Sequence, residues 1–119
     1  MPGVTVDDVR RLAGGLERAE EVVVRGRLKF RAGRLVFLAF SHDETLMGCG
    51  FPKELRQGLV EAEPHKFLLP RPGDMRYNWV VVRLAEIDHD EMRELVLDAW
   101  AMCVPKKVWE PYFARMFPK

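Results

Sequence analysis

A strict alternation of basic and apolar residues near the start of the chain constrains its fold most strongly. A period of two is typical of a half-buried strand. The continuous apolar run over residues 34–40 follows after a turn at Ala32-Gly33, and it predicts a buried partner strand. The two segments together predict a hairpin with a basic face. The residues on that face are Arg25, Arg27, Lys29 and Arg31, and those on the opposite face are Gly26, Leu28 and Phe30.

Two helices are predicted where a capping-box pair precedes apolar residues at helical spacing. In such a pair the first side chain and the residue three positions later satisfy each other's free backbone N–H groups. Thr5 with Asp8 begins the first of these helices, and Asp88 with Glu91 begins the longest one. The predicted ranges are residues 6–14 and 88–103.

Two further helices are predicted to begin at prolines, whose missing N–H needs no partner in a first helical turn. One begins at Pro52, and Leu55, Leu59 and Ala62 form its predicted buried stripe. The other begins at Pro105 and has an apolar face rich in aromatic residues. The predicted ranges are residues 52–62 and 105–117.

Three more strands are predicted from β-branched and aromatic content and from the turn residues between them. They cover residues 45–51, 66–69 and 77–84. Gly48 and Gly50 fall on the same face of their strand, which would allow a helix or another backbone to approach closely.

The element order predicts an α+β fold, because strands and helices are grouped without regular βαβ alternation. The order is helix, three strands, helix, two strands, helix, and a C-terminal helical appendage at residues 105–117. An antiparallel sheet packed on helices accommodates this order. The 119 residues are 48% hydrophobic, which is enough for one core but not for two domains. We therefore expect a single domain over residues 1–119, with its core at about residues 6–108.

Composition and short patterns predict a cytoplasmic protein without cofactors. The longest apolar run, Leu35 to Phe40, is too short to span a bilayer, and residues 1–8 lack the pattern of a secretory signal. Cys49 and Cys103 are far apart in sequence and lie in apolar surroundings, which favours two reduced thiols. No metal site is expected, because none of the histidines has the spacing of a zinc ligand set. They are His42, His65 and His89.

The residues that a catalytic nucleophile needs are scarce, so we expect no enzyme. Ser41 is the only serine, and it lies in a polar turn without the glycines of a nucleophile elbow. Cys49 could pair with His42 across a hairpin. A thiol between two glycines in a central strand is nevertheless more typical of a small core residue.

Basic residues gather in the predicted hairpin although the net charge of the chain is only +1. Positive charge along a two-stranded ribbon suits a phosphate backbone, and such ribbons can enter a DNA groove. The same residues would also serve as a soluble strand face that discourages edge pairing. We predict DNA binding, with affinity for phosphates rather than sequence readout. The predicted contacts are Arg25, Arg27, Lys29, Arg31 and Arg34.

Lys106 and Lys107 are predicted to assist this binding. They follow Pro105 at the start of the last predicted helix, where the positive end of the helix dipole disfavours them. An anion bound to the free backbone N–H groups would reverse that effect. Long lysine side chains that bend into solvent are the other interpretation.

A protein-interaction module is the alternative function. The segment Glu86–Asp98 carries six acidic residues and one arginine, so it could orient DNA toward the basic side or meet the basic hairpin of a second copy. Aromatic residues could form an apolar docking surface or a homodimer interface. A small-molecule site between sheet and helices is a third hypothesis. The aromatic residues are Trp79, Trp109, Tyr112, Phe113 and Phe117.

Several segments resemble the MmcQ/YjbR family of small bacterial proteins. They are Gly33–Phe40 after a basic strand, Pro64–Phe67, Arg76–Val80, Glu94–Trp100 and Val104–Val108. The resemblance covers residues 6–108. It implies an α-β(3)-α-β(2)-α fold similar to type III secretion chaperones, and a DNA-binding role that is attributed to family members from fold and surface charge. The Pro70–Asp74 loop differs from many members, and the family has no active-site signature to transfer.

Overall fold

Six antiparallel strands form one sheet in the structure, a computed structural model that describes residues 3–118. The strands are β1 (Ala19–Val24), β2 (Arg27–Ala32), β3 (Leu35–Phe40), β4 (Leu46–Gly50), β5 (Phe67–Leu68) and β6 (Trp79–Arg83). Their order in the sheet is β1-β2-β3-β4-β6-β5. Met1, Pro2 and Lys119 belong to the predicted domain 1–119 but lie outside the described residues.

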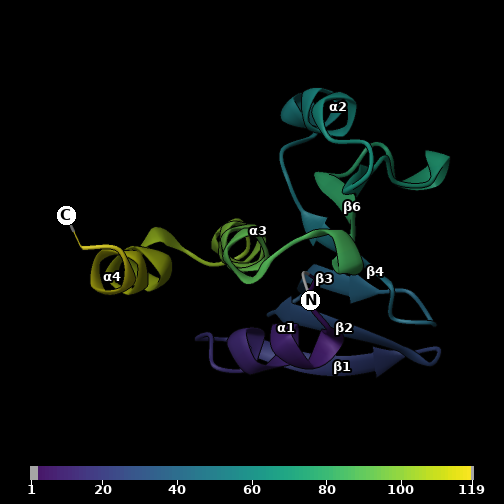
Figure 1. Ribbon diagram of the computed structural model, residues 1–119. Helices are drawn as coiled ribbons and strands as arrows, with labels where there is room; N and C mark the ends of the chain where they lie inside the picture. Colours follow the sequence, from purple (N-terminus) through teal and green to yellow (C-terminus); the bar gives the residue numbers. More distant parts are fainter. Residues whose placement is uncertain (1–2, 119) are drawn as a thin grey trace.

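Four helices complete the α+β fold, as predicted (Figure 1). They are α1 (Val6–Ala13), α2 (Lys53–Ala62), α3 (His89–Ala101) and α4 (Lys106–Met116), with short 3₁₀ turns at Pro72–Asp74 and Leu84–Glu86. Helix α3 contacts α1, β3 and β4, whereas α2 contacts β5 and β6. Helix α4 lies to one side of α3, away from the sheet.

The edge strand β1 is the element that the sequence patterns do not predict. The predicted order has three strands between the first two helices, and the structure has four. Every residue of β1 is exposed or only partly buried, and Val23 is 67% exposed. An edge strand with so little burial does not need polar and apolar residues to alternate, so the period of two is absent.

Two tight turns correct the predicted positions of two arginines. Arg25 and Gly26 join β1 to β2 with φ angles of 54° and 78°, the left-handed pair of a type I′ hairpin turn. Arg25 therefore lies in the turn and not on the predicted strand 25–31. Gly33, with a φ of 62°, and Arg34 form the next turn, so β3 begins after Arg34.

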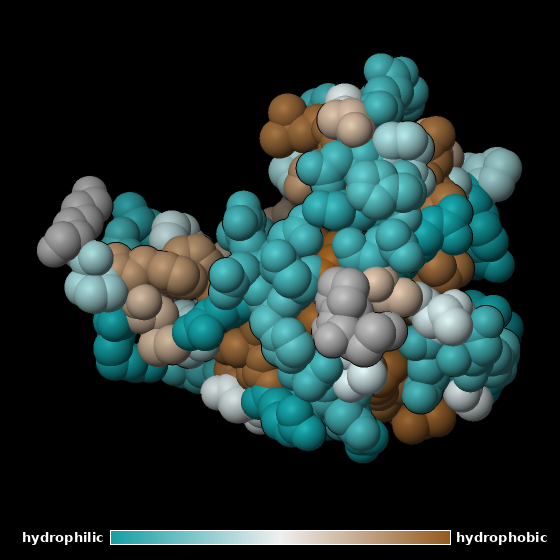
Figure 2. Space-filling view, in the orientation of Figure 1, coloured by the Kyte–Doolittle hydropathy of each residue, from teal (hydrophilic) through white to brown (hydrophobic). Residues whose placement is uncertain are grey.

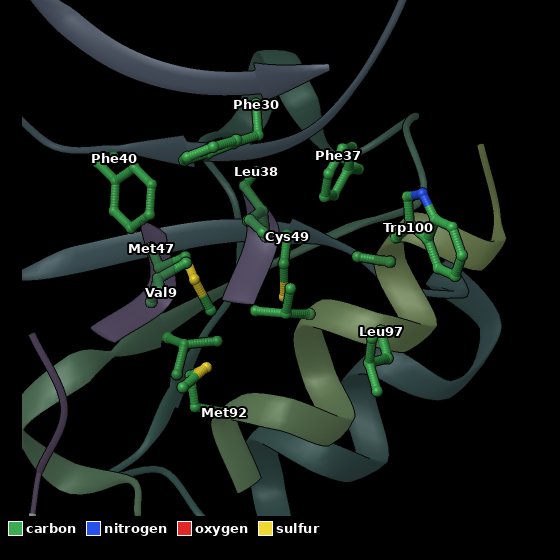
Figure 3. Packing of buried hydrophobic residues seen from close by; sticks show 14 of the residues in the cluster. Val9, Phe30, Phe37, Leu38, Phe40, Met47, Cys49, Met92, Leu97 and Trp100 are labelled. Atoms are coloured by element: carbon green, nitrogen blue, oxygen red, sulfur yellow. The ribbon is translucent and has the colours of Figure 1, made fainter. Parts of the chain in front are cut away.

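The core lies between the inner face of the sheet and the helices α1 and α3 (Figure 3). Phe30, Leu38, Cys49 and Val80 occupy neighbouring register positions on four strands, and all four are fully buried. The ring of Trp100 is also fully buried, and its Nε1–H donates to the carbonyl oxygen of Glu17 at 2.9 Å. This bond ties α3 to the segment between α1 and β1. Figure 2 shows hydrophilic residues over most of the outside in this view.

Both predicted capping boxes are present. At α1, the Thr5 N–H donates to Asp8 Oδ2 at 2.9 Å, and the Asp8 N–H donates to Thr5 Oγ1 at 3.3 Å. The Thr5 backbone hydrogen bond lowers the pKa of Asp8. At α3, the Glu91 N–H donates to Asp88 Oδ1 at 2.8 Å, and the Asp88 N–H donates to Glu91 Oε1 at 3.2 Å. Each box satisfies backbone donors that the helix leaves free.

Replacing Asp88 with alanine should lower the free energy of unfolding by about 1 kcal/mol, because the Glu91 N–H at the start of α3 loses its acceptor. Urea unfolding followed by circular dichroism measures this loss. The control is Asp90→Ala, which removes an exposed carboxylate from the same first turn. Equal losses in the two variants would show that the helix dipole, and not the cap, accounts for the effect.

Candidate functional site

The sheet face opposite α1 and α3 carries the basic residues of β2, and we call it the outer face. Lys29, Ala39, Gly48 and Val81 occupy neighbouring register positions across β2, β3, β4 and β6. Successive side chains of a strand point to opposite faces, so this row lies opposite the buried row in the core. Lys29 is therefore held at a defined place on the outer face by the register of four strands.

A groove of about 910 Å³ opens on the outer face. It extends from β2 across the sheet to β6 and to the segment before β6, and the end of α3 also lines it. Its lining is mainly apolar and also includes four cations and the carboxylate of Asp74. The lining residues that matter below are Arg27, Lys29, Arg34, Gly48, Arg71, Asp74, Tyr77, Asn78 and Trp79.

Three of the five predicted phosphate contacts line this groove: Arg27, Lys29 and Arg34. None of them forms an ion pair within residues 3–118. Their positive charge is therefore available to an anion. A fourth cation of the groove, Arg71, pairs with Asp74 at 3.4 Å.

The other two predicted hairpin contacts lie elsewhere. The Arg31 Nε–H donates to Glu20 Oε1 of the neighbouring strand at 2.8 Å, so its charge already has a partner. Arg25 is in the turn between β1 and β2 and does not line the groove. The hairpin face is thus less uniformly basic than the alternation alone indicates, because the unpredicted strand β1 supplies the carboxylate.

Lys106 and Lys107 begin α4, as the sequence predicts, but neither lines the groove. Lys106 pairs with Glu110 one turn later at 3.4 Å. Lys107 lines a separate cavity of about 240 Å³, together with Trp100 and Arg115. The structure therefore does not bring the two lysines together with the cations of β2.

Trp79 lies against Gly48, and this contact explains the glycine. A Cβ atom at Gly48 would lie 2.5 Å from Nε1 of the Trp79 indole, closer than such atoms approach. The predicted close approach at Gly48 is thus made by a side chain. A Cβ atom at Gly50 would lie 3.6 Å from the Cα of Ala99, an ordinary van der Waals contact, so α3 lies beside Gly50 without requiring a glycine there. Only glycine at position 48 leaves room for this indole in the groove.

The buried guanidinium of Arg56 holds the segment that carries the aromatic residues of the groove. Arg56 is only 5% exposed. Its Nη1 donates to the carbonyl oxygens of Tyr77 and Trp79, each at 3.0 Å, and its Nη2 donates to that of Met75 at 2.7 Å. Bonds from a charged donor are stronger than neutral ones. A single side chain on α2 therefore fixes the backbone on both sides of Asn78.

Asn78 adds a second connection between this segment and α2. Its Oδ1 accepts from the Lys53 N–H at the start of the helix at 3.0 Å, and the Lys53 Nζ donates to the Arg76 carbonyl oxygen at 3.2 Å. Pro52 has no side chain able to cap α2, so Asn78 takes that part from a distant place in the sequence. The start of α2 and the wall of the groove therefore depend on each other.

The sequence prediction missed Arg56 because only part of the predicted buried stripe of α2 faces the interior. Leu55 is 62% exposed and Ala62 is also exposed. Leu59 is partly buried against the core as predicted, together with Val60. Arg56 lies three and four residues before them, on the same side of the helix. That spacing is the signal that could have identified it.

A reactive thiol at Cys49 with His42 and a metal site were also considered from the sequence, and the structure bears on both. Burial raises the pKa of the Cys49 thiol to about 12, so it is not a thiolate near neutral pH. His42 lies against Gly26 at the β1–β2 turn. Residues 3–118 contain no cluster of three or more His, Cys, Asp or Glu that could hold a metal ion. No helix within this range is long and apolar enough to cross a membrane.

Of the aromatic residues of the alternative, a protein-docking surface, only Trp79 lines the groove. The other four are grouped on and just after α4: the ring centroid of Phe113 lies 5.4 Å from that of Trp109 and 6.0 Å from that of Phe117. Tyr112 packs on the buried Trp100 with ring centroids 5.3 Å apart, and Trp109 and Phe113 are also partly buried against the core. Phe117, at 53% exposure, is the most exposed aromatic residue of the five.

Comparisons with known proteins find a family model and bacterial relatives that match most of the chain. A family model described as YjbR matches residues 14–102. Uncharacterized proteins of Mycobacterium bovis and Mycobacterium tuberculosis are 29% identical to the chain over 128 aligned positions, covering 92% of this chain and 96% of theirs. The match therefore extends over nearly the full length of both.

A solved structure supports the fold. The crystal structure of a Deinococcus radiodurans protein with a DUF419 family domain superposes with a TM-score of 0.73. The two chains are 19% identical, and the match covers 93% of this chain and 89% of the other. At this identity the likeness concerns the fold alone.

Replacing Gly48 with alanine should displace the Trp79 indole and lower the free energy of unfolding by about 1–3 kcal/mol, since a Cβ atom has no room there. Chemical denaturation and tryptophan fluorescence measure the two effects. Gly58→Ala is the control, because nothing lies within 4 Å of a Cβ atom at Gly58 inside α2. That change should stabilise the protein by about 0.4–1 kcal/mol. A neutral Gly48→Ala variant would contradict the assigned contact.

Replacing Arg56 with methionine should lower the free energy of unfolding by about 2–4 kcal/mol, because three carbonyl oxygens lose their donor. Urea unfolding gives the magnitude, and hydrogen exchange of residues 75–79 reports whether this segment loosens. Gln57→Met, on the exposed side of the same helix, should change stability by less than about 0.5 kcal/mol. Similar effects of the two changes would contradict the conclusion that the Arg56 hydrogen bonds hold residues 75–79 in place.

Proposed function

The chain belongs to the YjbR family, and we propose that this member binds DNA through the groove on the outer face of its sheet. The proposal rests on one observation: Arg27, Lys29 and Arg34 line one groove, and none has an ion-pair partner within residues 3–118. Phosphates would supply those partners and release their own counterions, which favours binding.

The acidic residues of the segment Glu86–Asp98 lie mainly on the side of the sheet away from the groove, which favours approach of DNA from the groove side. Most of the acidic segment Glu86–Asp98 belongs to α3, which packs on the other side of the sheet from the basic row. Part of its charge is engaged, because the Lys66 Nζ lies 2.6 Å from Glu91 Oε2 and 3.1 Å from Glu63 Oε2. A polyanion would thus approach the groove and be repelled by the opposite side.

We propose binding without catalysis. The hydroxyl of Ser41 donates to Asp43 Oδ1 at 2.7 Å and accepts from the Leu46 N–H at 3.1 Å, so it stabilises its own turn. The Cys49 thiol is buried and protonated. Both cysteines are free, which suits the reducing conditions of the cytoplasm, the proposed location.

The charge reversal Arg27→Glu with Lys29→Glu should weaken DNA binding by at least about 10-fold, because each contact between a cation and a phosphate contributes on the order of 1.5 kcal/mol. Fluorescence anisotropy with labelled single-stranded and duplex DNA measures the affinity. Log affinity of the unmodified protein should fall against log salt with a slope of roughly −2 to −3, as expected for three phosphate contacts. Circular dichroism checks that the variant is folded.

Lys106→Glu with Lys107→Glu is the matched control, because it changes the net charge by the same amount outside the groove. It should leave the affinity within about twofold. An equal loss in both variants would place binding on the overall charge of the protein and not on the groove. Unchanged DNA affinity in the folded Arg27 and Lys29 variant would refute the proposal.

A further inference from the structure

We propose that the groove is built for single-stranded DNA, whose bases contact Tyr77 and Trp79 while its phosphates contact the cations of β2. This inference rests on the proposed DNA binding and names the form of DNA that the groove accepts. It follows from three features of the groove: its size, its aromatic residues, and the positions of its cations.

The size of the groove favours a single strand over a duplex. Its volume of about 910 Å³ lies within the range of clefts that enclose small ligands, roughly 300–1,000 Å³. A duplex would present mainly its phosphates to such a groove. Its bases also stack on one another, so their faces cannot reach a side chain inside the groove without being flipped out. A single strand exposes those faces.

The aromatic residues lie where unstacked bases could contact them. Tyr77 is 52% exposed, and the Arg76 guanidinium carbon lies 4.9 Å from the centroid of its ring. Trp79 lies two residues further on and also lines the groove. The Arg56 hydrogen bonds to the carbonyl oxygens of both residues hold them in place before any ligand arrives. Aromatic side chains of this kind bind bases of any sequence, because every base has a π-face.

The cations of the groove that are unpaired within residues 3–118 lie to one side of these aromatic residues. Arg27 and Lys29 belong to β2, and Trp79 belongs to β6, three strand positions away in the sheet. Neighbouring strands are ~4.8 Å apart, so about 14 Å separates the basic and aromatic rows. Arg71 lines the groove from the segment before β6, where it is paired with Asp74. A strand laid across the sheet would thus meet Arg27 and Lys29 at one end and aromatic rings at the other, and a basic groove with aromatic rings is the combination found in proteins that bind single strands.

The test compares anisotropy titrations with three labelled probes of about 12 nucleotides: oligothymidylate, its duplex with oligoadenylate, and oligouridylate. The unmodified protein should bind the single DNA strand at least about 10-fold more tightly than the duplex. Tyr77→Ala should weaken single-strand binding by roughly 5- to 150-fold, the range for loss of one stacked base, and change duplex binding by less than about twofold. Trp79→Leu should act in the same direction.

Phe117→Ala is the control for Tyr77→Ala, because the two rings are almost equally exposed and Phe117 does not line the groove. It should leave every affinity unchanged. Tyr77 is suited to the main test because its exposed ring can be removed with little effect on folding. If Trp79→Leu does not fold, the comparison of Tyr77→Ala with Phe117→Ala still tests the proposal.

The outcomes separate this inference from the function on which it rests. Duplex and single strand bound equally well, with Tyr77→Ala neutral, would overturn the single-strand assignment and leave DNA binding in place. Tighter binding of oligouridylate than of oligothymidylate would overturn the assignment to DNA. No binding of any probe by the folded protein at about 50 mM salt would overturn the proposed function itself.

Discussion

The packing of α3 on the inner face of the sheet is the contact on which the rest of the structure depends. Helix α3 contacts α1, β3 and β4, and its buried residues Val96, Ala99 and Trp100 belong to the same core as the inner-face residues of the strands. The buried indole also donates its only hydrogen bond to the segment after α1, so sheet, α1 and α3 are held as one unit. Because these helices cover one face of the sheet, the opposite face is left to carry the basic residues of β2.

The outer face combines charge with preorganisation. Register places Lys29 on the same face as Gly48 and Val81, and the small size of Gly48 leaves space for Trp79. The backbone around Trp79 is in turn held by Arg56 from α2. Rigid elements thus hold the groove residues in position, which reduces the ordering that a ligand would otherwise have to impose.

The candidate site was only partly predictable. Alternation correctly put Arg27 and Lys29 on one face, because the side chains of a strand must alternate. It also put Arg31 with them but could not show that Glu20 of an edge strand would pair with it. Arg56 escaped notice for a related reason: a charged residue is expected outside, and its carbonyl partners lie 19 to 23 residues further along the chain.

Local pattern alone determined the α+β class, both capping boxes and the helices and strands with strong periodicity, because each depends on residues a few positions apart. The tertiary structure decided the features that depend on distant residues. It added the edge strand β1, moved Arg25 and Arg34 into turns, and separated Lys106 and Lys107 from the basic row. The groove also depends on the tertiary structure, since its lining residues come from β2, from β6 and from the end of α3, which are far apart in the sequence.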